Sequence, residues 1–155
     1  MPARLTTLNA PARCPGHQRA WLLALLLLLL RPGWAALGEA PSASLTSSQN
    51  GYAVHETVAD NGTRVQEFVS PAGLVFAVAW QGPVLPDLSL LLGRFHASYR
   101  LETEQKRLAG LRGGPVAMAR DGLVLRSNGR MRQFFGYAYA PALVPAGVNI
   151  QDVLP

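Results

Sequence analysis

The chain has 155 residues, with 14 basic and 9 acidic side chains and a formal net charge of +5. Four of the basic residues and the single cysteine, Cys14, precede residue 36, so the remaining 120 residues carry a net charge of only +1 and no thiol. Disulfides and thiolate metal sites are thereby excluded from that part of the chain. Its near-neutral charge also removes the argument for a nucleic-acid partner.

The first 35 residues are typical of a secretory leader. Met1–Ala20 contains three arginines and no acidic residue, Trp21–Leu30 is continuously apolar, and small residues follow Arg31. This order predicts a signal peptide that is cleaved after Ala35 or Gly38. A membrane-spanning helix needs about 20 apolar residues, so we expect no transmembrane anchor after cleavage. The chain is therefore expected to be exported, to the periplasm or the extracellular space.

A short lead-in and a buried strand follow the leader. Residues 36–50 are small, polar and rich in serine, which predicts a flexible lead-in to one domain over 51–155. Alternating patterns on either side of Asn61-Gly62 predict a β-hairpin, because both residues accept the positive φ of a tight turn. Leu74–Trp80 is a continuous apolar run between turn residues, which predicts a strand buried on both faces.

One helix and three strands are predicted after this run. Asp87 stands at the N-cap of a helix expected over 88–107, which Gly93 should kink or divide. Its apolar stripe is Leu88, Leu91, Leu92, Phe95 and Tyr99. The strands and their turns are 116–120, Asp121-Gly122, 123–127, Asn128-Gly129 and 130–139. The order β-β-β-α-β-β-β predicts an α+β fold, an antiparallel sheet of about six strands with one main helix packed on it.

The stretch Phe68–Gly93 resembles a family of short exported proteobacterial proteins that carry a domain of unknown function. The matching residues are Val69, Ser70, Pro71, Ala72, Gly73, Phe76, Trp80, Gly82, Pro83, Pro86, Asp87, Leu88 and Gly93. The start at Tyr52–Glu56 and the end at Pro145–Gly147 are also similar. The resemblance implies a Gram-negative source and export, and it implies no activity, cofactor or site residue.

Three polar residues of the first hairpin are candidates for chemistry: His55, Glu56 and Glu67. A two-residue loop at Asn61-Gly62 places Glu56 opposite Glu67 on one face. In an apolar setting such carboxylates share a proton, as catalytic pairs do, or hold a cation. A three-residue loop shifts the register by one residue and pairs His55 with Glu67 in an ordinary cross-strand contact. A third arrangement leaves both carboxylates in water.

Charge is segregated along the chain after the leader, from a net −4 over residues 36–93 to a net +6 over residues 94–132. The basic residues of the second stretch include three of the last hairpin, Arg126, Arg130 and Arg132, and four of the helix, Arg94, Arg100, Lys106 and Arg107. Such a surface suits an anionic envelope component or an acidic protein. The alternative is a solvated helix face and a charged sheet edge that deters aggregation.

The last predicted strand carries an aromatic row, Phe135, Tyr137 and Tyr139, on one face. An exposed row of this kind stacks sugars or bases. A buried row forms core beneath the helix, and we expect this arrangement because Phe95 and Tyr99 need residues to pack against.

The sequence contains no Gly-rich phosphate loop, no His-rich zinc pattern and no nucleophile elbow, so no catalytic, cofactor-binding or metal-binding residue is expected. The candidates for any site are His55, Glu56, Glu67, Arg126, Arg130 and Arg132. The sequence favours a small exported non-enzymatic domain that binds a protein or an envelope component. One alternative is a small periplasmic hydrolase or metal-assisted enzyme. Another is an assembly or folding accessory factor that lends its sheet edge to another chain.

Overall fold

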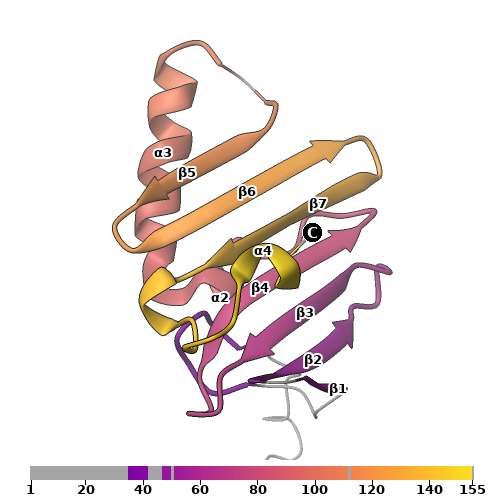
Figure 1. Ribbon diagram of the computed structural model, residues 1–155. Coiled ribbons are helices and arrows are strands. Elements are labelled where there is room, and N and C mark those ends of the chain that lie inside the picture. Colours follow the sequence, from indigo (N-terminus) through magenta and orange to yellow (C-terminus); the bar gives the residue numbers. More distant parts are fainter. Residues whose placement is uncertain (1–34, 42–46, 50, 112, 155) are drawn as a thin grey trace, which may run out of the picture. The chain divides into compact units, whose positions relative to one another are not determined.

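The computed structural model describes residues 35–41, 47–49, 51–111 and 113–154. Its centre is a seven-stranded antiparallel sheet of order β1-β2-β3-β4-β7-β6-β5 (Figure 1). The strands are β1 Ser47–Gln49, β2 Tyr52–Val58, β3 Arg64–Val69, β4 Val75–Gly82, β5 Val116–Arg120, β6 Leu123–Arg130 and β7 Gln133–Tyr139. The predicted antiparallel sheet with one main helix is therefore confirmed, and β1 adds a strand that the sequence did not predict.

The predicted helix is divided by Gly93, as expected. It consists of α2 (Leu88–Leu92), a 3₁₀ turn η1 (Gly93–Phe95) and α3 (His96–Leu108). Asp87 caps α2, because its Oδ1 accepts a hydrogen bond from the Ser89 amide at 2.8 Å. Hydrogen bonds from the Ser89 hydroxyl and amide hold the pKa of Asp87 below its usual value. None of the helices in the described ranges is long and apolar enough to cross a membrane.

The predicted apolar stripe of the helix packs on one face of the sheet. Leu88, Leu91 and Leu92 are buried in this first core, and Phe95 and Tyr99 pack against it. Burying each leucine contributes about 2 kcal/mol. The sheet residues of this core include Val65, Val69, Val78, Trp80, Leu123, Leu125 and Ala138. These contacts hold the helix against β3, β4, β6 and β7.

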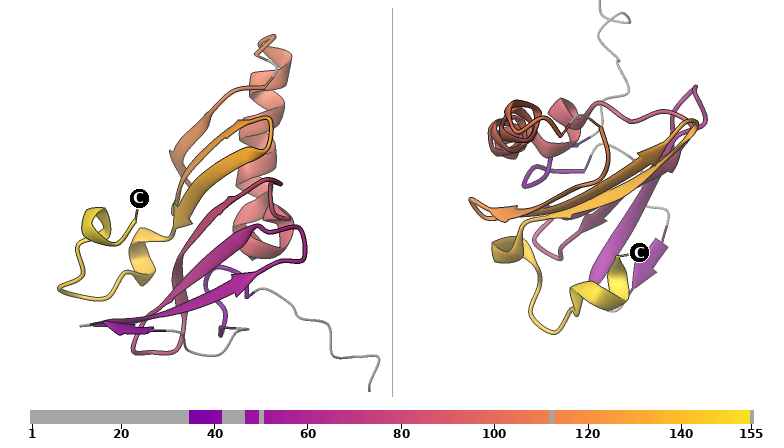
Figure 2. Two further views of the ribbon diagram at one scale, coloured as in Figure 1. Left: turned by 90° about the vertical axis from the view of Figure 1, so that its right-hand side faces the viewer. Right: turned by 90° about the horizontal axis from the view of Figure 1, so that it is seen from above.

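The opposite face is partly covered by the end of the chain. A 3₁₀ turn η2 (Pro141–Leu143) and α4 (Ile150–Val153) lie on the side of the sheet away from α3 (Figure 2). They enclose a second core, whose members include Phe68, Phe76, Ala77, Tyr139, Val148, Ile150 and Val153. The sheet is therefore the middle layer of three, whereas the sequence predicted a helix on one face only.

Strand β4 is buried on both faces, as predicted, and it contains a β-bulge. Val69 lies opposite Val75, and Phe68 lies opposite Ala77, so Phe76 is an additional residue in β4. A bulge reverses the alternation of side chains between the two faces. Phe76 and Ala77 consequently both belong to the second core.

The predicted turns have different outcomes. Asp121-Gly122 forms the two-residue turn between β5 and β6, with φ of 51° and 73°. Asn128-Gly129 was predicted as a turn, and this prediction is wrong because both residues lie within β6. The turn is instead formed by Met131 and Arg132, because Arg130 still pairs with Gln133. A side chain at Gly129 would overlap the ring of Phe134. Gly129 therefore allows the ring of Phe134 to lie close to the backbone of β6.

The lead-in prediction is wrong for the described residues of 36–50. Leu37 is 1% exposed, and its amide donates to the Leu91 carbonyl at 3.0 Å. Gly38 donates to the Val75 carbonyl at 2.8 Å, and β1 belongs to the sheet. The small and polar residues of this stretch predicted flexibility, but its described residues around Leu37 pack against the first core. Of the predicted leader over residues 1–35, residues 1–34 lie outside the described residues, and Ala35 is buried in the first core.

We predict that Gly136→Ala destabilises the fold through steric overlap. A methyl group there would lie 2.5 Å from the Arg126 carbonyl oxygen and 2.6 Å from Cζ2 of Trp80. The expected loss in the free energy of unfolding is about 3 kcal/mol, measured by urea denaturation. The control is Gly73→Ala, where φ is 78° and no atom lies within 4 Å, and which should cost about 1 kcal/mol through backbone strain alone. Equal losses would contradict the steric explanation.

Candidate functional site

The polar residues of the first hairpin are divided between the two faces of the sheet. His55 lies opposite Glu67, and Glu56 lies opposite Gln66. The Ala59 amide donates to the Thr63 carbonyl at 2.8 Å and closes a three-residue loop. The prediction that pairs Glu56 with Glu67 is therefore wrong, and the alternative register, which places His55 opposite Glu67, is confirmed.

The two faces give these carboxylates different surroundings. Glu67 is 1% exposed on the face covered by the helix, where Oε1 accepts a hydrogen bond from the Ala35 amide at 2.8 Å. Glu56 is half-buried on the other face, where it accepts from Gln66 Nε2 at 2.9 Å and lies 3.4 Å from Arg64 Nε. The ranges covered by the structure contain no group of three or more His, Cys, Asp or Glu residues that can hold a metal ion. The convergent trio required by the hydrolase alternative is thus not found in them.

The aromatic row of β7 does not lie beneath the helix, so that prediction is wrong. Phe135, Tyr137 and Tyr139 lie opposite Gln81, Ala79 and Ala77 of β4, on the face away from α3. Side chains alternate between the two faces along β7, and the neighbouring Ala138 is buried in the first core, on the opposite face. Tyr137 and Tyr139 pack against the second core, whereas Phe135 is 48% exposed.

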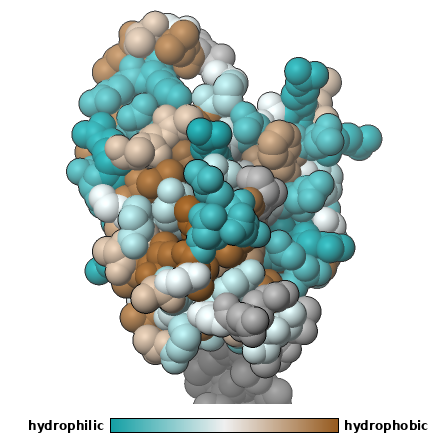
Figure 3. Space-filling view, in the orientation of Figure 1, coloured by the Kyte–Doolittle hydropathy of each residue, from teal (hydrophilic) through white to brown (hydrophobic). Residues whose placement is uncertain are grey.

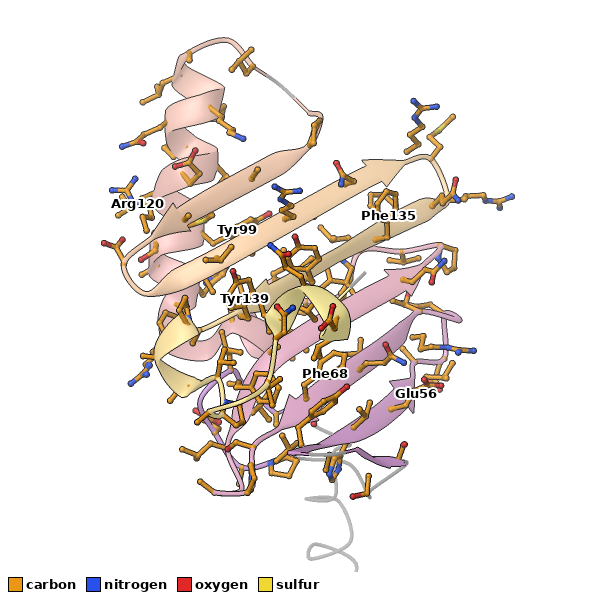
Figure 4. All side chains as sticks on the ribbon, in the orientation of Figure 1. Glu56, Phe68, Tyr99, Arg120, Phe135 and Tyr139 are labelled. Atoms are coloured by element: carbon orange, nitrogen blue, oxygen red, sulfur yellow. The ribbon has the colours of Figure 1, made fainter. Side chains whose placement is uncertain are left out.

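Beyond the C-terminal segment this face of the sheet is uncovered, and we call the uncovered part the open face. It comprises Glu56, Arg64, Gln66, Gln81, Arg126, Asn128, Arg130, Gln133, Phe135 and Tyr137. Figure 4 shows Phe135 away from α4, and Tyr139 and Phe68 beside it. In Figure 3 hydrophilic side chains dominate the right-hand side, where the hairpin turns lie. The open face is therefore a polar surface with an aromatic side chain at its centre.

Two hollows meet at Phe135. One has a volume of about 260 Å³ and is lined by Arg64, Gln66, Ala79, Trp80, Gln81 and Phe135. The other, of about 500 Å³, is lined by Pro115, Asn128, Gly129, Arg130, Gln133 and Phe135. Phe135 stands between them, directly opposite Gln81 on one side and Asn128 on the other. The surface can thus receive an extended ligand across four strands.

The predicted basic surface separates into two parts. On the helix side, Arg107 pairs with Glu104 at 2.6 Å, Arg120 lies 3.6 Å from Glu102, and Arg94 lies over the ring of Phe95. In the last hairpin, Arg126, Arg130 and Arg132 are exposed, and no carboxylate of the described residues lies within 4.0 Å of them. Arg126 and Arg130 share the face of Phe135, so the hairpin part lies beside an exposed aromatic ring.

Sequence reasoning identified the arginines of this site and missed its amides. Gln66, Gln81 and Asn128 come from three strands, and only the register brings them to one face. The alternation of polar and apolar residues in β3 was the available signal, because Arg64 and Gln66 share a parity opposite to that of the buried Val65.

We predict that Phe135→Ala lowers the free energy of unfolding by only about 1 kcal/mol, because half of this side chain is already in water. The matched control Phe76→Ala removes a fully buried ring and should cost about 4 kcal/mol. Urea denaturation of both variants provides the comparison. A loss at Phe135 as large as that at Phe76 would assign Phe135 to the core.

The chain matches, over residues 32–153, the family described as "Protein of unknown function (DUF2844)". No curated protein and no solved structure matches the chain. The family match includes every strand and helix described above, and it confirms the resemblance to a domain of unknown function that the sequence indicated. The chain therefore belongs to the DUF2844 family of proteins of unknown function.

Proposed function

We propose that this protein is an exported, non-enzymatic domain that binds an acidic glycan of the cell envelope on its open face. One observation carries the proposal: Phe135 is 48% exposed between two hollows, on a face that also holds Arg126 and Arg130 without carboxylate partners among the described residues. A half-exposed aromatic side chain among polar residues is typical of a binding surface.

The groups of the open face complement a charged sugar chain. The C–H groups of a sugar face carry partial positive charge, which suits the negative face of the Phe135 ring. Arginine binds carboxylates with two parallel hydrogen bonds, so Arg126 and Arg130 suit uronic acids. The side-chain amides of Gln66, Gln81 and Asn128 both donate and accept, as sugar hydroxyls require. An extended chain uses both hollows, whereas a small compact ligand uses only one.

Export of the domain is supported by the leader pattern of residues 1–35. The envelope is then the first surface that the exported domain meets.

The test is binding of residues 36–155 to alginate, a polyuronate, with neutral dextran as the comparison. We expect saturable binding to alginate that weakens with added salt, because the arginines are exposed. Phe135→Ala and Arg126→Gln should each weaken it by about tenfold. The control is Arg100→Gln on the exposed surface of α3, which should leave affinity unchanged.

Equal losses in all three variants, or equal binding to dextran, would contradict this assignment. Envelope extracts at low and high salt extend the test, since an acidic protein or lipid captured there in place of a glycan would also overturn the ligand class.

The edge strand β5 favours a second candidate function, that of an accessory factor which adds its sheet edge to another chain. β5 pairs with β6 on one side, and its residues 116–119 carry no charge, so it resembles an unprotected edge. A protein captured from the envelope that is lost with Ala119→Pro but retained with Phe135→Ala would favour this function. The opposite pattern would favour the open face.

A further inference from the structure

Residues 35–39 lie against the first core, which includes Ala35 and Leu37. Ala35, Ala36 and Leu37 are 5%, 7% and 1% exposed. The Leu37 amide donates to the Leu91 carbonyl at 3.0 Å, and the Val75 amide donates to the Glu39 carbonyl at 2.9 Å. The segment therefore lies between α2 and the start of β4, and it is bonded to both.

Gly93 makes room for the side chain of Ala36. A Cβ at Gly93 would lie 2.6 Å from the Cβ of Ala36, so only glycine allows this approach. Gly93 also has φ of 48°, at the break between α2 and η1. The break in the helix and the placement of Ala36 are thus parts of one arrangement.

This geometry distinguishes the two cleavage positions that the leader pattern allows. Cleavage after Gly38 would remove Ala36 and Leu37 from the core, together with the hydrogen bond from Gly38 to Val75. Cleavage after Ala35 leaves all of these in place, and it removes only Ala35 from the first core. Ala35 and Gly33 then occupy the positions where a signal peptidase requires small residues.

Glu67 supplies a partner for the amino group that cleavage creates. Its carboxylate is 1% exposed, and Oε1 accepts from the Ala35 amide at 2.8 Å. Hydrolysis of the Ala35–Ala36 bond consumes one water, releases the Ala35 carboxylate with the leader, and leaves an amine on Ala36 that takes up a proton at neutral pH. Adjacent Cα atoms are about 3.8 Å apart, so this ammonium arises within one residue of the donor it replaces.

Replacing an amide by an ammonium strengthens the contact. An ammonium brings three donors and a positive charge, and hydrogen bonds between charged partners are shorter and stronger than neutral ones. A charged donor offsets more of the cost of burying a carboxylate than a neutral amide does. Resting on the proposed export, we infer that the leader is removed at the Ala35–Ala36 bond and that the new amino terminus is bound by Glu67 inside the core.

The first test expresses the full chain in an exporting Gram-negative host and determines the amino terminus by mass spectrometry. We expect a chain that starts at Ala36. A start at Glu39, or at any other residue, would overturn the inference while leaving export intact. A chain that retains its leader would instead contradict export itself, so the two failures are distinguishable.

The second test measures the accessibility of the new amine. Lys106 is the only lysine of the chain, so the mature protein has two primary amines. Acylation by an N-hydroxysuccinimide ester at pH 7 should modify the α-amine at least about tenfold more slowly in folded than in urea-unfolded protein. Lys106, which is partly exposed, serves as the internal reference. Equal α-amine rates in the two states would overturn the inference.

Two variants test whether Glu67 causes the slow acylation of the α-amine. Glu67→Gln removes the charge with little change of shape and should raise the α-amine rate about threefold or more. Should this variant fail to fold, a glycine inserted before Ala36 moves the amine away from Glu67 and should have the same effect. Leu37→Ala is the control, because it weakens packing while it leaves the ion pair in place. Unchanged protection in the glycine-insertion variant would contradict the assigned contact.

Discussion

Strand β4 must be kept from water on both faces, and the rest of the structure depends on this constraint. All six residues from Val75 to Trp80 are buried, and they have paired strands on both sides. One face is covered by the helix and by residues 35–39, the other by the C-terminal segment. The second cover is short, and the second core beneath it extends along β4 from Phe76 to Ala79. The open face is the part of the sheet that this segment leaves uncovered.

The sequence predicted those features that depend on local chemistry. The apolar run of β4, the helical stripe and the cap at Asp87 each concern a few adjacent residues, and each is present in the structure. The register of the first hairpin was left open, because Asn-Gly serves loops of two or three residues and one residue of slip moves every side chain to the other face. The positions of Glu56 and Glu67 could be decided only by the hydrogen bonds of the loop.

Glycine explains the wrong turn prediction at Asn128-Gly129, because it serves two purposes that look identical in a sequence. At Gly122 it supplies positive φ, and the turn prediction is confirmed there. At Gly129 and Gly136 it makes room for the rings of Phe134 and Trp80 from neighbouring strands, as aromatic side chains do over glycines in sheets. Nε1 of Trp80 has no hydrogen-bond partner among the described residues, so the ring contributes through its apolar area. Tertiary contacts of this kind have no signature in a single sequence, and neither has the amide cluster of the open face.

The two ends of the described chain also depend on each other. Leu143 packs against both cores, and its Cδ1 lies near Gly38 in the segment that leads away from Leu37. Residues 35–39 and the C-terminal segment therefore meet at the same end of the sheet, where β4 begins. A domain of this size without cysteine has no covalent cross-link to hold its ends, so packing alone must do so. Phe135 and the arginines of the last hairpin lie at the far end of the sheet. They do not take part in this packing, so substitutions there need not weaken it.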